Sequence, residues 1–238
     1  MIQEQVRRFL SEQSPLSRHR SIMEGESLQA SDVWQGLAEL GLQGTAIPEA
    51  FGGVGAGYLP LCLVAQELGG VLAAVPFSSS VYLATEAISC FGSADQKERY
   101  LPRLASGEWV GTLAVSEGPL APSPTNLTVA RSGDTISGKK LVVPHGLAAN
   151  FAVVLVKSGA GTDLVLAGLD GIERAAVEIV DPSIAAATID FAETPCESLG
   201  EPGDGWTMLD TLQHRAAVLY AFEQIGGAEQ ALNMAVAY

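Results

Sequence analysis

The hydrophobic period of the chain changes twice, and these two changes limit the folds that it can adopt. Apolar residues recur at helical spacing up to about residue 109, alternate in short runs from 110 to about 192, and return to helical spacing from Gly205. We therefore predict an α+β protein, with an all-α N-terminal domain over 1–109 and a β-barrel middle domain over 110–202. Residues 203–238 are expected to form the first helix of a truncated C-terminal helical domain, which would be a helical bundle.

The expected helices of the first part carry recognisable end signals. Ser31 is the expected cap of a helix that stops at Gly41. Ser93 and Gln96 form the pattern of a capping box, in which each side chain bonds to the other residue's backbone N–H. Pro102 is expected to kink or end the helix that this capping box opens, because its ring displaces a backbone hydrogen bond.

The middle of the chain contains seven short apolar runs between residues 110 and 192, separated by turn signals such as "SGD" and "SGAGTD". Many short strands at this spacing indicate a small sandwich or barrel rather than βαβ units. No GxGxxG follows an expected strand, so the sequence does not predict a Rossmann dinucleotide site.

The last segment, from Gly205 to Tyr238, is predicted to be one long helix. One of its faces carries large apolar side chains, which a lone helix cannot bury. We expect further helices of the same polypeptide or another subunit to cover this face, and hence a dimer or larger assembly. The residues concerned are Met208, Leu212, Leu219, Phe222 and Ile225.

Charge and composition exclude several classes of function. The 238 residues carry a net charge of −14, which disfavours binding to nucleic acid or to an anionic membrane. No apolar run reaches the length of a membrane span. Three scattered cysteines and three unclustered histidines predict no metal site, and reduced thiols fit a cytoplasmic protein. Because Glu4 and Glu12 interrupt the basic start, we expect an amphipathic helix there rather than a transit peptide.

Several short motifs, in order along the whole chain, resemble those of the acyl-CoA dehydrogenases. They include "PEAFGGVGAG", "FGSADQKERYLPRLASGEW", "LAVSEG", "SGKKLVVPHG", "LGEPGDGW" and "EQIGGAEQAL". The resemblance implies a flavoprotein oxidoreductase of lipid β-oxidation that binds FAD and an acyl-CoA thioester. It implies α,β-dehydrogenation with hydride transfer to the flavin, in a homo- or hetero-oligomer with another acyl-CoA dehydrogenase-like subunit.

The first flavin-binding segment implied by the resemblance lies in "VGTLAVSEGPLAPSPTNLTVAR", where a strand stops at "SEG" (116–118) before a proline-rich loop. The family writes this strand end and loop as TEPxAGSD, and it lines the flavin pocket. The resemblance places Leu113, Val115 and Ser116 against the cofactor and Ser123 against the thioester substrate. A stiff strand end and loop suit this task because they lose little entropy on binding. Without the resemblance, the residues alone favour a proline-rich surface loop.

The second implied segment departs from the family pattern GxKxWITNG. Gly138, Lys140 and Gly146 match, whereas the tryptophan, isoleucine, threonine and asparagine are replaced by "VVPH" (142–145). The resemblance places Val142 and Pro144 at the flavin. Proline has neither an N–H nor a hydroxyl group, so the family's threonine hydrogen bond cannot form here.

His145, within "VVPHG", is either a functional substitute for the family's side chains or a polar surface residue of this loop, and a lone loop histidine favours the second interpretation. The same stretch resembles divergent bacterial members of mixed-subunit dehydrogenases, in which one chain carries the catalytic base and another completes the flavin site.

No catalytic residue is assigned. The family's alternative position for the catalytic carboxylate falls on Ala216, and the nearby candidates His214, Asp210 and Glu223 are expected to be ordinary helix residues. Two functions remain open. One is an acyl-CoA dehydrogenase that needs a C-terminal domain or a partner subunit for its base, and the other is a non-catalytic partner subunit. The yellow colour of bound flavin distinguishes them.

Overall fold

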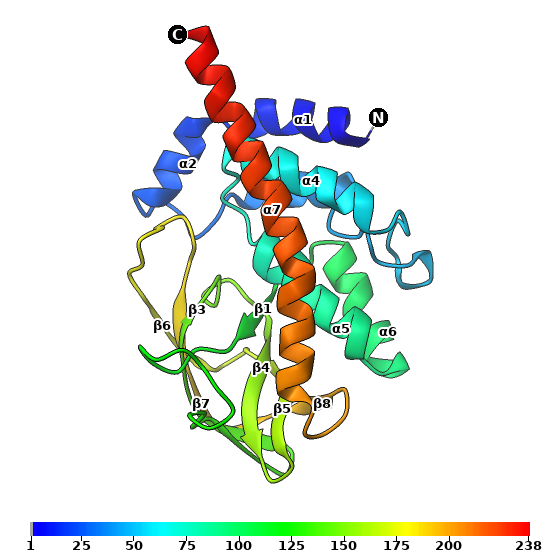
Figure 1. Ribbon diagram of the computed structural model, residues 1–238, viewed down its shortest axis with the longest axis vertical. Coiled ribbons are helices and arrows are strands. Elements are labelled where there is room, and N and C mark those ends of the chain that lie inside the picture. Colours follow the sequence, from blue (N-terminus) through cyan, green and yellow to red (C-terminus); the bar gives the residue numbers. More distant parts are fainter. Residues whose placement is uncertain (1) are drawn as a thin grey trace.

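The computed structural model describes residues 2–238, in which helices gather at one end of the molecule and strands at the other (Figure 1). The helices before the sheet include a short 3₁₀ turn, η1, and a π-helical segment, η2. Their bounds are α1 (Ile2–Gln13), α2 (Leu16–Met23), α3 (Ser31–Glu39), η1 (Glu49–Phe51), α4 (Tyr58–Val71), η2 (Ser78–Thr85), α5 (Glu86–Phe91) and α6 (Ala94–Ala105).

Eight strands of the described chain form one mixed sheet in the order β6-β7-β3-β2-β4-β5-β8, and β1 pairs with β4 outside this path. β1 and β2 run parallel to β4, and the other neighbours are antiparallel. The predicted α+β class is confirmed. The strands are β1 (Gly111–Ala114), β2 (Ala130–Ser132), β3 (Thr135–Val143), β4 (Phe151–Ser158), β5 (Gly161–Gly168), β6 (Glu173–Ala176), β7 (Ala187–Pro195) and β8 (Glu197–Leu199).

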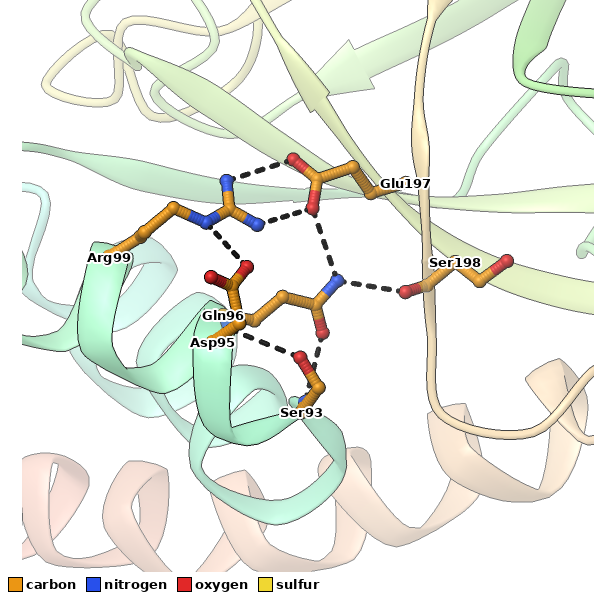
Figure 2. Close-up of polar contacts among 6 residues, drawn as sticks. All are labelled: Ser93, Asp95, Gln96, Arg99, Glu197 and Ser198. Carbon is orange, nitrogen blue, oxygen red and sulfur yellow. Dashed lines mark hydrogen bonds and ion pairs between the residues drawn. The ribbon is translucent and has the colours of Figure 1, made fainter.

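The predicted capping box at the start of α6 is confirmed, and it also joins the helices to the sheet (Figure 2). Gln96 accepts a hydrogen bond from the Ser93 N–H at 3.0 Å, and its own N–H donates to Ser93 Oγ at 3.2 Å. The side-chain amide of Gln96 also donates to the carbonyl of Ser198 on β8 at 2.9 Å. One turn further along α6, Arg99 pairs with both oxygens of Glu197 at 3.1 and 2.6 Å.

Two predicted helix ends differ in the structure. Ser31 is the first residue of α3 rather than its cap; Ala30 takes the cap position and makes no side-chain hydrogen bond. Pro102 does not end α6, which continues to Ala105. Burial explains this continuation, because Leu104 in the last turn is almost fully buried, and the Ser106 N–H still bonds to the Pro102 carbonyl at 3.0 Å.

The long helix α7 (Gly205–Ala237) runs from the sheet past α5 to α4 and α1 (Figure 1). It packs against α4, η2 and β5. Met208, Leu212 and Leu219 are therefore buried within the chain, and the expectation that later helices or a second subunit must cover them is wrong. Phe222 is half-buried, and Ile225 remains 52% exposed.

Glycines let α7 lie directly on α4. A Cβ atom at Gly69 would meet the carbonyl oxygen of Glu223, and one at Gly226 would meet the carbonyl oxygen of Gln66. Both contacts are closer than real Cβ atoms approach, so the two helix backbones touch. This contact fixes which part of α7 faces the interior.

Two features are absent between residues 2 and 238. None of the helices there combines the length and the hydropathy needed to cross a membrane. The same residues contain no group of three or more His, Cys, Asp or Glu side chains placed to hold a metal ion.

We predict that Gln96→Ala lowers the free energy of unfolding by about 1–2 kcal/mol, because it removes half of the capping box and leaves the Ser198 carbonyl without its donor. Glu98→Ala, on an exposed position of the same helix, is the control and should change stability by less than about 0.5 kcal/mol. Urea unfolding measures both. Equal effects of the two substitutions would contradict the role given to the Gln96 amide.

Candidate functional site

The two segments that the motifs predict to bind cofactor lie side by side. The Leu141 N–H donates to the carbonyl of Ser116 at 2.8 Å, just beyond the end of β1. The hydroxyl of Thr112 on β1 donates to the carbonyl of Pro144 at 2.6 Å. The structure therefore brings the end of β1 next to the end of β3, although the two are separated by a long loop in the sequence.

The predicted site residues differ in how far they reach the surface. Leu113 is buried in β1, whereas Val115 and Ser116 are half-buried where the strand ends. Val142 and Pro144 are exposed. These five residues therefore form a surface patch with a buried base, at the junction of β1 and β3.

The end of β3 is irregular and strained. Its pairing with β7 shifts register between Lys140 and Val143, which marks a β-bulge. Val142 within this bulge has φ of +52°, and His145 after it has the same value. A β-branched residue in the left-handed region is costly, and such strain is found preferentially at functional sites.

Unused backbone donors lie at the end of β1. Within residues 2–238, the N–H groups of Val115 and Ser116 have no hydrogen-bond acceptor. The Ser116 hydroxyl donates only a long bond of 3.4 Å to the Gly118 carbonyl. Half-buried backbone donors are normally satisfied, so this strand end is suited to donate to a bound ligand.

A buried ion pair explains why the strand stops at Ser116-Glu117. Lys140 is fully buried, and its Nζ atom donates to Glu117 Oε1 at 2.6 Å and to the Val115 carbonyl at 3.0 Å. The Glu117 carboxylate also accepts hydrogen bonds from the Thr128 N–H at 2.5 Å, the Thr128 hydroxyl at 2.6 Å and the Val129 N–H at 3.2 Å. We call these contacts the Glu117–Lys140 clasp; it closes the loop 118–127 and ties it to β3.

Charge and burial act in opposite directions on Glu117. Burial alone raises the pKa of its carboxyl group, but hydrogen bonds from Lys140 and Thr128 outweigh this effect and hold the pKa below its ordinary value. Glu117 is therefore ionised at neutral pH and can hold the loop. Lys140 matches the family pattern, but its pairing with Glu117 was not predicted, because strand alternation does not tell whether Lys139 or Lys140 points inward.

Ser123 is not joined to the other predicted site residues. It lies on the loop 118–127, where its N–H bonds to Asn126 Oδ1 at 2.8 Å and its hydroxyl lies 3.1 Å from the Thr125 hydroxyl. These bonds are all within the loop. The structure therefore gives Ser123 a part in the loop's own turn, and its predicted role in substrate binding stays a prediction.

His145 is buried, contrary to the expectation of a surface residue. Only 3% of it is exposed, because the loop turns inward after Pro144, and His145 lines a cavity together with the segment 181–184 and the α4–η2 link. Burial lowers the pKa of His145 to about 4, with a smaller opposing effect from Asp181. The ring is therefore neutral at physiological pH.

Of the candidate bases on α7, only Glu223 faces the interior. Ala216 is buried, and His214 is exposed with its Nδ1 atom 3.3 Å from the carboxylate of Asp210. Burial raises the pKa of Glu223 to about 7, and the nearby hydroxyl of Tyr82 partly opposes this shift. Glu223 is thus not the ordinary helix residue that the sequence analysis expected.

Comparisons with known proteins agree on the family. Residues 1–108 match the family model described as the acyl-CoA dehydrogenase N-terminal domain. Mitochondrial isovaleryl-CoA dehydrogenase of Bos taurus is 33% identical over 164 residues, which are 66% of this chain and 38% of that protein. A variant of the Tcur3481-Tcur3483 steroid ACAD has a TM-score of 0.87 and 29% identity, over 100% of this chain and 65% of that chain.

A further solved structure shares the fold. An acyl-CoA dehydrogenase of Bacillus anthracis, complexed with FAD, has a TM-score of 0.88 at 20% identity, over 100% of this chain and 43% of that chain. The chain studied here belongs to the acyl-CoA dehydrogenase family, as its motifs indicated. It spans 38% to 62% of the length of the first curated relatives that it matches.

We predict that Lys140→Met lowers the free energy of unfolding by about 3–5 kcal/mol, because it leaves the Glu117 carboxylate buried without its cation. Lys139→Met is a matched control on the next residue. Its side chain is 60% exposed and pairs with Asp190, so its loss should leave the free energy of unfolding almost unchanged. Hydrogen exchange of residues 117–129 should rise only in Lys140→Met; equal exchange in both variants would contradict the clasp.

We also predict that Glu223→Gln stabilises the protein at pH 8 but not at pH 4. The unfolded chain ionises Glu223 above its ordinary pKa of 4.5, whereas the folded chain keeps it protonated until about pH 7. This difference disfavours the folded state increasingly from pH 4.5 to 7, by at most about 3 kcal/mol, and the glutamine removes it. Urea unfolding at the two pH values checks this; the same gain at both would be evidence against it.

Proposed function

We propose that the chain is part of an FAD-dependent acyl-CoA dehydrogenase and holds the flavin at the junction of β1 and β3. The observation that carries this proposal is the hydrogen bond from the Leu141 N–H to the Ser116 carbonyl, which brings two motif segments together. The flavin ring needs hydrogen-bond donors, and the N–H groups of Val115 and Ser116 are free to donate. The strained bulge at Val142 lies at the same junction. Family membership and the FAD bound in the Bacillus anthracis structure support this assignment.

The residues present fit FAD with one departure from the family pattern. Leu113, Val115 and Val142 offer apolar contacts, and the β1 end offers backbone donors, whereas Pro144 offers no donor. The chemistry that bound FAD would supply here is acceptance of a hydride, which in this family is the β-hydrogen of an acyl-CoA thioester. The chain's own part is to orient the flavin: the Glu117–Lys140 clasp holds the loop beside Ser116, and the half-buried strand end limits the access of water.

The base that removes the α-proton is proposed to come from outside residues 1–238, either from a C-terminal domain or from a partner subunit. Ala216 stands at the family's position on α7, and His214 and Asp210 are exposed. Glu223 faces the interior but lies seven residues beyond that position. Loss of a positioned base typically lowers the rate by about 10²–10⁴-fold. We therefore expect no turnover of acyl-CoA by this chain alone with an electron acceptor.

A three-part organisation accompanies this proposal: 1–109 helical, 110–202 β, and 203–238 the start of a further helical domain. The chain is proposed to act in a homo- or hetero-oligomer with another acyl-CoA dehydrogenase-like subunit. The similar steroid ACAD is named for two components, Tcur3481 and Tcur3483, and this supports an assembly of two different subunits.

The second candidate function is that of a non-catalytic partner subunit of a heteromeric acyl-CoA dehydrogenase. Pro144 in place of the family's threonine and Ala216 in place of a carboxylate favour it. A purified chain that stays colourless after addition of FAD supports this function, and one with flavin absorbance supports the first.

We predict that Ser116→Trp abolishes retention of FAD, lowering occupancy at least about 10-fold, because the indole fills the space beside the free N–H groups at the end of β1. Ser132→Trp, on an exposed position of β2, is the control and should leave occupancy unchanged. Flavin absorbance per mole of purified protein measures both. Unchanged flavin content in Ser116→Trp would place the cofactor elsewhere.

A further inference from the structure

A cavity of about 280 Å³ lies where the helices meet the loops of the sheet. Its walls come from the α4–η2 link, from α7, from α2 and from two loops beside β3 and β7. The apolar part of the lining consists of residues 72–75 and Ile184, and the polar part includes His19, His145 and Glu223. We call it the His145–Glu223 cavity.

Three buried polar atoms that lack a partner belong to residues lining this one cavity. Over the part of the chain that the structure describes, His19 Nδ1, His145 Nδ1 and Glu223 Oε2 make no hydrogen bond of normal geometry. The Tyr82 hydroxyl lies near enough to Glu223 to act on its pKa, so the two histidine nitrogens are the clearer case. The three atoms come from α2, from the loop after β3 and from α7, so no local turn accounts for them. Buried polar atoms are nearly always hydrogen-bonded, and three unsatisfied ones around one space point to a ligand that bonds to them.

The charges around the cavity favour a neutral ligand. Burial disfavours charge on both His145 and Glu223, as their pKa values of about 4 and about 7 indicate. The Asp181 carboxylate accepts bonds from the Ser183 N–H at 3.0 Å and the Ser183 hydroxyl at 2.6 Å, so it already has partners. An anion would lie close to the Asp181 carboxylate, and a cation would lose its water next to His145 and Glu223, whose charged forms burial disfavours.

We propose that the His145–Glu223 cavity binds a small uncharged organic molecule that carries a hydroxyl or carbonyl oxygen on a hydrocarbon frame. The hydrocarbon lies against residues 72–75, and the oxygen bonds to His145 and Glu223. His145 directly follows Pro144, so the cavity adjoins the proposed flavin segment. As an extension that rests on the proposed function, the oxygen belongs to the acyl group of the thioester, remote from its reacting carbons.

The test uses three probes that share a six-membered ring: cyclohexanol, cyclohexanecarboxylate and cyclohexylammonium. The full chain is labelled with ¹⁵N-histidine, and the ring nitrogens of His145 and His19 are followed by NMR. Cyclohexanol should shift both rings saturably, with a dissociation constant of about 1 mM as suits a ligand of so few atoms. The charged probes should bind at least about 10-fold more weakly. Absence of saturation with cyclohexanol, or equal binding of a charged probe, overturns the proposal.

Variants separate binding from folding. Glu223→Leu and His145→Asn should each weaken cyclohexanol binding at least about 10-fold, and asparagine tolerates the left-handed backbone at position 145. Glu223→Gln, which keeps a hydrogen-bonding group, should retain binding. His214→Asn, on an exposed position of the same helix, is the matched control. Unchanged binding in both Glu223→Leu and His145→Asn overturns the proposal.

A separate titration tests the link to the acyl substrate. Hexanoyl-CoA and 6-hydroxyhexanoyl-CoA have the same chain length, and the hydroxylated thioester should bind about 10-fold more tightly, with the preference lost in Glu223→Leu. Equal binding of the two thioesters overturns the assignment to the acyl group. If cyclohexanol binds but neither thioester does, the cavity stands as a binding site and the proposed function fails.

Discussion

The direct contact between the backbones of α4 and α7 is the constraint on which the rest of the structure depends. Gly69 and Gly226 leave no side chain between the two helices, so α7 packs closely against α4 and also contacts η2 and the sheet. This position buries Met208 and Leu212 within the chain and turns Glu223 toward the interior. A methyl group at either glycine would push the two helices apart. Because α7 forms one wall of the His145–Glu223 cavity, that wall would move as well.

The order of helical and strand segments could be predicted from the sequence because it depends on the local spacing of apolar residues. Helical and alternating patterns each reflect the geometry of a few neighbouring residues, and the capping box of Ser93 and Gln96 lies within one turn. Two predictions that depended on distant packing differ from the structure. Pro102 stays inside α6, whose last turn is buried. Met208, Leu212 and Leu219 of α7 are covered by earlier parts of the same chain, namely α4, η2 and β5, whereas Ile225 stays exposed.

In the candidate site too, local features were predicted and contacts between distant residues were not. Motif order was enough to point to the ends of β1 and β3, which the structure places side by side. The Glu117–Lys140 clasp was not predicted, since its meaning depends on which of two consecutive lysines faces inward. His145 was placed on the surface because a loop histidine usually lies there, whereas the left-handed backbone at this residue accompanies a loop that turns its ring inward. Neither feature has a signature in a single sequence.

The Gln96 side chain has a consequence for the order in which the chain can fold. Its amide completes a helix start at residue 93 and also bonds to a carbonyl at residue 198, more than a hundred residues later. The face of α4 that packs on α7 must likewise wait until residues 205–237 have been made. On the ribosome, the first six helices therefore emerge with apolar surface that nothing yet covers, and contacts of such long sequence separation form slowly. We expect nascent chains in which α7 has not yet emerged to depend on chaperones for solubility.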